Sequence, residues 1–187
     1  MEIARSKSGI HLCKRKYALD IVEDFGYLDC KPASTPMDYS TKLSSESGTL
    51  LSDFANYRQL VGRLMYLANP RPDISYVMGC LSQFVDCPTI AHLEVAFRVL
   101  RYLKGCPTLG LFFPCDSDFK VSGFSDPDWT ACIDTRHSVT GYCFYLGNAL
   151  ISWKSKKQTI VSRSSSKAEY RALANATCDA QWLSFIF

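Results

Sequence analysis

The segment GFSDPDW at 123–129 places two carboxylates, Asp126 and Asp128, at the end of a short apolar stretch. Another acid, Glu169, lies in the first turns of a predicted helix that follows predicted hairpin strands. A strand aspartate and a helix glutamate that meet at a sheet edge offer the oxygen ligands that Mg²⁺ prefers. Two such ions ~3.5 to 4 Å apart clamp the attacking water and the leaving oxygen in phosphodiester hydrolysis. The pattern predicts a metal site on Asp126 and Glu169, with an acidic turn as the alternative.

Charge is distributed unevenly around these acids. Five acidic residues and one basic residue lie between 112 and 134, whereas seven basic residues and one acidic residue lie between 135 and 171. Such a basic stretch can contact the phosphates of a polyanion held near metal-binding carboxylates, and a solvated sheet face is the competing interpretation. The candidates for phosphate contact are Arg136, Lys154, Lys156, Lys157 and Arg163.

The elements before this region are predicted to be mainly helical. A strand at 9–13 leads into a helix that Gly26 ends, and the Pro-, Ser-, Thr- and Gly-rich segment 31–51 is predicted to be a mobile linker or loop. Apolar residues then recur with helical spacing over 52–68, 71–86 and 88–105. In the first of these helices, Ser52 is the predicted N-cap.

Alternating apolar and β-branched residues replace the helical pattern after Gly105. Antiparallel strands are predicted over TLGLFF, KVSGFSD, VTGYCFYL and NALISWKS, with a hairpin turn at Gly147 and Asn148. A closing helix, capped by Ser164 or Ser165, is predicted to pack on the sheet through Ala168, Ala172, Leu173 and Ala176. The fold class is α+β, divided into 1–51, 52–108 and 109–187.

Composition narrows the class of protein. The 187 residues are 47% hydrophobic, enough for a real core, but the longest apolar runs are far shorter than the ~18 residues of a membrane span. The N-terminal segment lacks the apolar stretch of a secretory signal. Nine cysteines without a CxxC pair indicate reduced thiols, mostly small core residues, in an intracellular compartment, cytoplasmic or nuclear.

Several ordered motifs carry a resemblance that covers essentially the whole chain. They are LDCKPASTPM, YRQLVGRLMYLANPRPDISYVM, RVLRYLKG, GFSDPDW, TRHSVTGYCFYLG and ISWKSKKQTIVSRSSSKAEYRAL. Together they resemble the Ty1/copia-type retrotransposon Pol polyprotein, from the end of the reverse transcriptase region into the ribonuclease H domain. The string RVLR at 98–101 also matches the RxLR motif of secreted effectors, but here it lies inside a predicted amphipathic helix.

The resemblance implies Mg²⁺-dependent hydrolysis of the RNA strand of RNA/DNA hybrids, with Asp126 and Glu169 as the metal ligands. The partners that it implies are the hybrid and the remainder of the polyprotein, with no membrane. Two positions depart from the family wording: Pro127, which a strand tolerates if it ends at Asp126, and Lys167, where an acid is usual.

A third departure concerns the family's later carboxylates, which follow on the strand after this helix and are absent from the sequence. The chain is therefore expected to be a truncated ribonuclease H-like fold that is inactive or weak. The alternative is a non-catalytic remnant that at most binds nucleic acid. The apolar residues Trp182, Phe185, Ile186 and Phe187 are expected to be uncovered and to cause self-association.

Overall fold

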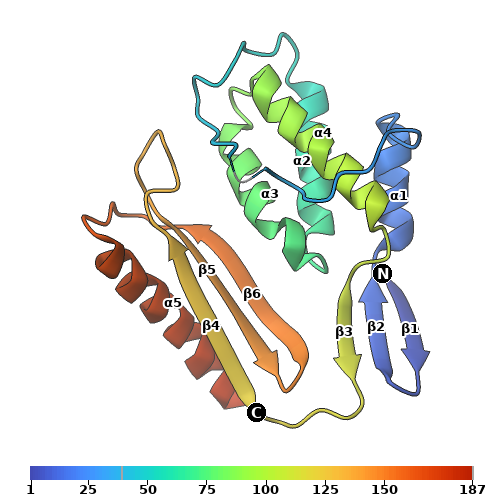
Figure 1. Cartoon of the computed structure of the whole chain (residues 1–187), viewed down its shortest axis with the longest axis vertical. Helices are drawn as coiled ribbons and strands as arrows, with labels where there is room; N and C mark the ends of the chain where they lie inside the picture. The colour runs from blue at the N-terminus through green and yellow to red at the C-terminus, as the bar shows by residue number, and fades with distance from the viewer. Residues whose placement is uncertain (39, 187) are drawn as a thin grey trace. The chain divides into compact units, whose positions relative to one another are not determined.

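The computed structural model describes residues 1–38 and 40–186 and has the α+β architecture that the sequence predicts (Figure 1). The described residues form five α-helices and two three-stranded sheets. The chain divides into two compact units: unit 1 is Met1–Ala4 with His11–Leu111, and unit 2 is Arg5–Ile10 with the chain from Phe112 onward. The finer division at 51 and 108 stays a prediction.

The first sheet has the strand order β1-β2-β3 and joins the two ends of the helical region (Figure 1). Its strands are β1 (Glu2–Ser6), β2 (Gly9–Cys13) and β3 (Leu111–Pro114). The sequence did not predict β1, and the expectation that TLGLFF joins the later hairpin strands is wrong. Glycine makes the close pairing possible, because a Cβ atom at Gly110 would lie 2.1 Å from the Leu12 carbonyl oxygen.

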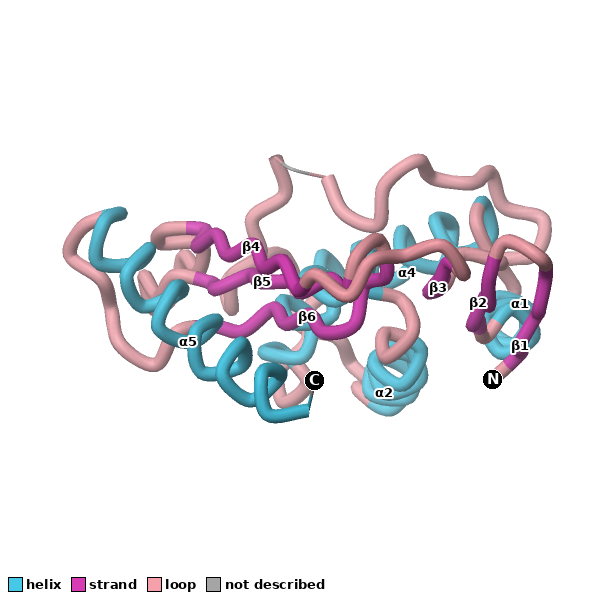
Figure 2. Tube along the Cα trace, turned by 90° about the horizontal axis from the view of Figure 1, so that it is seen from below, coloured by secondary structure: helices cyan, strands magenta, loops and turns pink. Residues whose placement is uncertain are grey.

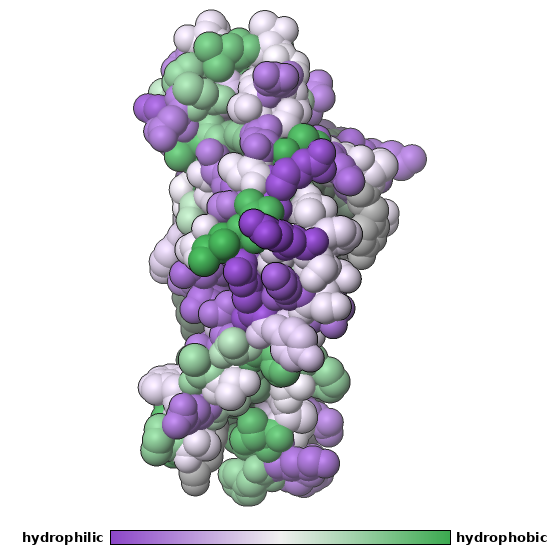
Figure 3. Space-filling model, turned by 90° about the vertical axis from the view of Figure 1, so that its left-hand side faces the viewer, coloured by the Kyte–Doolittle hydropathy of each residue, from purple (hydrophilic) through white to green (hydrophobic). Residues whose placement is uncertain are grey.

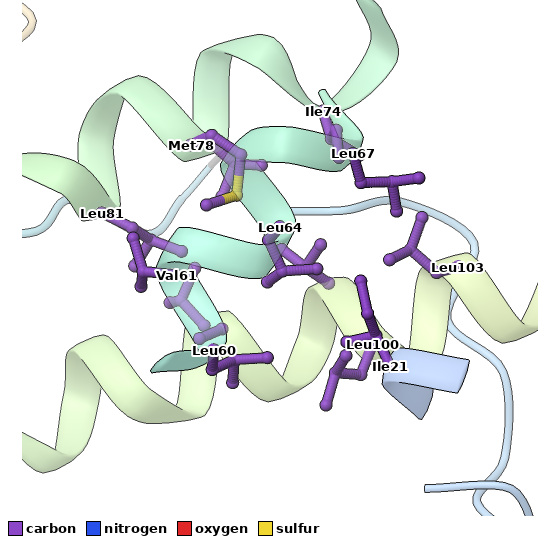
Figure 4. Packing of buried hydrophobic residues seen from close by; sticks show 14 of the residues in the cluster. Ile21, Leu60, Val61, Leu64, Leu67, Ile74, Met78, Leu81, Leu100 and Leu103 are labelled. Carbon is purple, nitrogen blue, oxygen red and sulfur yellow. The ribbon is translucent and has the colours of Figure 1, made fainter. Parts of the chain in front are cut away.

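Four helices build the core of unit 1. They are α1 (Arg15–Asp24), α2 (Ala55–Leu67), α3 (Ser75–Leu81) and α4 (Ile90–Gly105). Figure 4 shows Ile21, Leu64 and Leu100 converging from α1, α2 and α4 on one buried cluster. Burial of such side chains contributes ~1.5–3 kcal/mol each, so this cluster is the main source of stability for the unit.

Two details of these helices differ from the sequence-based expectation. The pattern over 71–86 is not one helix, because the 3₁₀ turns Pro72–Ile74 and Ser82–Phe84 flank α3. Ser52 is not the N-cap of α2, whose N-cap residue is Phe54; instead, the Asp53 carboxylate accepts a hydrogen bond from the Ala55 N–H at 2.9 Å. A short Asp side chain next to the first turn satisfies an N–H group that the helix leaves free.

The described residues of 31–51 form the loop that the sequence predicts, apart from an isolated bridge at Leu50, and side chains of α4 bind several of them. The Arg98 and Arg101 side chains donate hydrogen bonds to the Thr35 and Lys31 carbonyl oxygens at 3.2 and 2.8 Å. Farther along, the buried imidazole of His92 lies 3.1 Å from the Ser44 carbonyl oxygen. Helix α4 thus supplies hydrogen-bond partners for backbone carbonyl groups of this polar loop.

Unit 2 contains the second sheet and the last helix. The strands β4 (Val121–Asp128), β5 (Val139–Leu146) and β6 (Ala149–Lys157) have the order β4-β5-β6 and are antiparallel. The predicted turn is confirmed, with Gly147 at φ 55°. Such a positive φ suits glycine, which has no Cβ to clash.

Helix α5 (Ser165–Ile186) lies along one face of this sheet (Figure 2). Ala168, Ala172 and Ala176 are buried as predicted, and their small size lets the helix approach the strands closely. The prediction that Leu173 shares this face is wrong, because its side chain is 55% exposed. The Ser164 hydroxyl accepts a hydrogen bond from the Lys167 N–H at 3.3 Å, which confirms the predicted serine cap.

The composition also bears on membrane-spanning helices and on the role of the cysteines. No helix among residues 1–38 and 40–186 is long and apolar enough to cross a membrane. All nine cysteines are free thiols. Their predicted role as core residues is mostly wrong, because Cys13 alone among these nine is buried and Cys87, Cys115 and Cys178 are exposed.

The C-terminal half of α5 exposes large apolar side chains, namely Trp182 (61% exposed), Phe185 (80%) and Ile186 (54%). Phe187, which the sequence places in the same group, lies outside the described residues. Hydrophobic residues also gather at the lower end of the face seen in Figure 3, the end at which α5 finishes in Figure 1.

We expect this surface to drive concentration-dependent self-association, because contiguous exposed apolar area favours burial against another molecule. Light scattering should show a particle mass that rises with concentration for the unaltered chain and stays monomeric for the W182S/F185S variant. The matched control is S184A, since Ser184 lies on the same exposed stretch but contributes little apolar area. Equal masses for all three proteins at all concentrations would contradict the expectation.

Candidate functional site

Asp126 lies in β4, on the open edge of the second sheet. The strand continues through Pro127 to Asp128, so the expectation that it ends at Asp126 is wrong. Pro127 is paired with Thr140 of β5. An edge strand tolerates proline because only the side facing its neighbour needs N–H donors.

The two faces of this sheet carry different groups. Tyr142 and Phe144 of β5 pack with α5, and their partners in β4, Ser125 and Gly123, therefore share the helix-covered face. Asp126 is paired with Gly141 instead. Since successive residues of a strand point to opposite faces, the exposed Asp126 carboxylate lies on the face away from α5.

Glu169 lies in the second turn of α5, next to the buried Ala168, and is exposed. The start of this helix is tied to the end of β4, because the Trp129 indole N–H donates to the Ser162 carbonyl oxygen at 3.0 Å. Asp126 and Glu169 therefore lie at the same end of unit 2. Trp129 acts there as a partly exposed hydrogen-bonding residue and not as the core aromatic that a strand end usually supplies.

A buried amide braces the start of α5. The Gln158 side chain donates to the Thr140 hydroxyl at 3.0 Å and to the Ala168 carbonyl oxygen at 3.1 Å, and it accepts from the Ser162 hydroxyl at 3.1 Å. All of these groups except the Ala168 carbonyl belong to buried polar residues. These hydrogen bonds hold β5, the loop after β6 and the start of α5 together. They therefore fix the position of Glu169 relative to the sheet.

The donor set suits a hard cation only in part. Asp126 and Glu169 offer carboxylate oxygens, the ligands that Mg²⁺ takes. Among residues 1–38 and 40–186, however, no group of three or more His, Cys, Asp or Glu side chains is placed to hold a metal ion. The predicted ligands lie in the same region of the fold without forming a closed site of their own.

Three of the five residues that were predicted to contact phosphate lie around one cavity. Lys154, Lys156 and Lys157 line one cavity between β5, β6 and α5, whereas Arg136 and Arg163 do not line it. Arg171 of α5 completes the group, although it is far from β6 in the sequence. Its position one helical turn before Asn175 and two before Cys178 and Asp179, which also line the cavity, is a helix-face signal that could have identified it.

Burial and hydrogen bonds shift the pKa values of two groups in unit 2, Tyr142 in the cavity wall and Cys132, which contacts Lys157. Burial, followed by the hydrogen bond that the Tyr142 hydroxyl donates to the Asp179 carboxylate, raises the pKa of Tyr142 above its ordinary range. For the Cys132 thiol, burial alone would raise the pKa, but hydrogen bonds from Thr135 and Lys157 outweigh burial and lower it. The Lys157 ammonium donates to Cys132 Sγ at 3.1 Å, so Lys157 already has a partner inside the protein.

The chain is similar to several known proteins. It is 46% identical to the retrovirus-related Pol polyprotein from transposon RE1 of Arabidopsis thaliana over 98% of this chain, and it spans 12% of that polyprotein. An uncharacterised mitochondrial protein of the same plant is 43% identical over 98% of this chain and 76% of its own length. A protein of Plasmopara viticola named secreted RxLR effector protein 161 is 44% identical over 68% of this chain and 90% of its own length.

Other comparisons gave no match. No family model matches the chain. No solved structure matches it either.

Proposed function

The chain belongs to the Ty1/copia-type family of retrotransposon Pol polyproteins, and we propose that it contributes part of a ribonuclease H domain to such a polyprotein. The observation that carries the proposal is the arrangement of unit 2, in which hairpin strands with Asp126 on the first precede a helix that carries Glu169 in its second turn. The family activity is hydrolysis of the RNA strand of RNA/DNA hybrids.

Asp126 and Glu169 would hold Mg²⁺ through their carboxylate oxygens. When bound, the metal lowers the pKa of a coordinated water and offsets the charge that develops on the phosphate. Because the described residues place no third acid beside these two, we propose that the chain in isolation cleaves hybrids weakly or not at all. In the polyprotein, the strand that the family places after this helix would add the next carboxylate.

The matched variants D126N, E169Q and D116N test the assignment of the two acids. Paramagnetic Mn²⁺ should broaden the NMR signals of residues near Asp126 and Glu169 in the unaltered chain. Each of D126N and E169Q should weaken this broadening, because each removes an anionic ligand while keeping the side-chain shape. D116N should not change it, since Asp116 is also an exposed acid but lies outside the proposed pair.

Broadening that persists at both positions in D126N and E169Q would contradict the metal assignment. Cleavage is measured separately, with a labelled RNA/DNA hybrid and Mg²⁺. Robust cleavage by the unaltered chain that D126N abolishes would confirm the two acids as ligands but contradict the proposal that the chain alone is weak. Hybrid binding without metal-dependent broadening would favour the second candidate, a non-catalytic nucleic-acid-binding remnant, for which the clustered lysines of β6 are the supporting observation.

The effector name of one relative is not part of the proposal. In the RVLR string, Val99 and Leu100 are fully buried in the helical core, and both arginines donate hydrogen bonds to the segment 31–51. These four residues therefore have a structural role in α4. We propose an intracellular location, and the free thiols are the supporting observation.

A further inference from the structure

A cavity of about 360 Å³ lies within unit 2, between β5, β6, the loop after β6 and one flank of α5. This volume is at the low end of the ~300–1,000 Å³ that small-molecule sites occupy. The face of the sheet that forms its floor is the one covered by α5, since Lys154 and Lys156 are paired with Tyr142 and Thr140. Asp126 lies on the other face of the sheet, and neither Asp126 nor Glu169 lines the cavity.

The cavity gathers positive charge that the protein itself does not neutralise. Lys154 and Lys156 enter from β6 and Arg171 from α5, and within residues 1–38 and 40–186 none of the three takes part in an ion pair. One acid, Asp179, lines the cavity, and its carboxylate already accepts the Tyr142 hydroxyl. Like charges that converge in a concave site destabilise the fold and concentrate anions there.

Arg171 is held in a fixed orientation. Its Nη1 donates to the Ile160 carbonyl oxygen at 2.9 Å and lies 3.3 Å from the Ser162 hydroxyl. Both bonds use the same nitrogen, and within the described part of the chain Nη2 and Nε make no further hydrogen bond. The guanidinium therefore presents two N–H donors side by side, the geometry that binds phosphate oxygens in pairs.

We propose that this cavity binds a phosphate ester, with Arg171 donating to two of its oxygens and Lys154 and Lys156 supplying the opposing positive charges. A phosphate fits better than a carboxylate because its several oxygens can meet the arginine and both lysines at once. The same chemistry occurs in a free nucleotide and in the backbone of a nucleic acid. The inference goes beyond the proposed metal site, since it requires neither Asp126 nor Glu169 to hold a metal. It shares the lysines of β6 with the second candidate function and adds Arg171 and a phosphate-sized cavity to them.

Calorimetric titration of the full chain in EDTA tests the site with four probes: pyrophosphate, a mononucleotide, a short single-stranded oligonucleotide and a glutamate peptide. The K154Q/K156Q variant should bind the phosphate probes at least about tenfold more weakly, as expected for loss of charge-assisted contacts. The R5Q/K7Q variant removes the same charge from an exposed hairpin and should bind like the unaltered chain. D126N should also bind the phosphate probes as the unaltered chain does. This result would separate the phosphate site from the proposed metal site.

Asp179 allows a test of opposite sign. D179N keeps an oxygen to accept the Tyr142 hydroxyl but removes the negative charge, so phosphate binding should become several-fold tighter. Binding of the mononucleotide identifies a nucleotide-sized ligand, and binding of the oligonucleotide alone identifies a nucleic-acid backbone; both support the site. Absence of binding, equal binding of the glutamate peptide, or unchanged affinity in both K154Q/K156Q and D179N would overturn it.

Discussion

Replacing Arg71 with methionine is expected to lower the free energy of unfolding of unit 1 by about 3–5 kcal/mol, the usual cost of breaking a buried ion pair. The Arg71 side chain is 1% exposed, and its Nε and Nη2 donate to the two Asp73 carboxylate oxygens at 2.9 and 2.7 Å. Its Nη1 also donates to the Cys106 carbonyl oxygen, next to the end of α4, at 3.0 Å. The substitution leaves the Asp73 charge and the Cys106 carbonyl without these partners.

The measurement should follow unit 1 alone. The three tryptophans all lie after residue 111, so hydrogen exchange of α2 and α4 reports on the helical unit more directly than tryptophan fluorescence. R15M is the matched control, because the Arg15–Glu2 pair is 3.5 Å long and largely exposed. Its expected cost is ~0–1 kcal/mol. If R71M lowered the free energy of unfolding no more than R15M does, the contacts of Arg71 with Asp73 and Cys106 would not stabilise unit 1.

Replacing Gly123 with alanine is expected to destabilise unit 2 by about 1–3 kcal/mol, as for overpacking of a core. A Cβ atom at Gly123 would lie 2.3 and 2.6 Å from two ring carbons of Phe144. Phe144 is 4% exposed and packs with Tyr142 and Leu183 in the cluster between the sheet and α5. The ring must move, which disturbs the strand that carries Asp126.

Urea unfolding followed by tryptophan fluorescence measures this effect, with G141A as the control. Gly141 lies on the neighbouring strand, and its added Cβ would meet the Asp126 carbonyl oxygen at an ordinary 3.5 Å. G141A should therefore be neutral or stabilise by up to ~1 kcal/mol, because alanine restricts the unfolded chain. Adding F144L to G123A should recover part of the loss. Equal stabilities of G123A and G141A would show that the Phe144 ring is not the obstacle.

Local patterns predicted most of the secondary structure. Apolar spacing located α1, α2, α4 and α5, and the alternation between 121 and 157 located three paired strands with their turn at Gly147. These signals are short-range, since helix and strand periods recur within a few residues. The helix over 71–86 was less well predicted because the competition between α and 3₁₀ turns depends on packing.

Long-range partners were the part that local pattern did not reveal. Nothing within TLGLFF tells which strand it pairs with, and the Gly110–Leu12 approach that pairs β3 with β2 joins residues 98 positions apart. The contacts of Lys31 and Thr35 likewise depend on arginines of α4, far away in the sequence. The polar, glycine- and proline-rich composition of a segment does not show which hydrogen-bond donors other elements will supply to its backbone.

The candidate site, like the fold, could be predicted from the sequence only in part. Residue types and their order were enough to identify the family and to select Asp126, Glu169 and the three lysines of β6 as candidates, because neither depends on coordinates. The three-dimensional arrangement was needed to place Asp126 on the face away from α5 and to bring Arg171 to Lys154 and Lys156 around one cavity. The physical reason is that strand pairing selects the face of each side chain, and helix packing selects which distant charges converge.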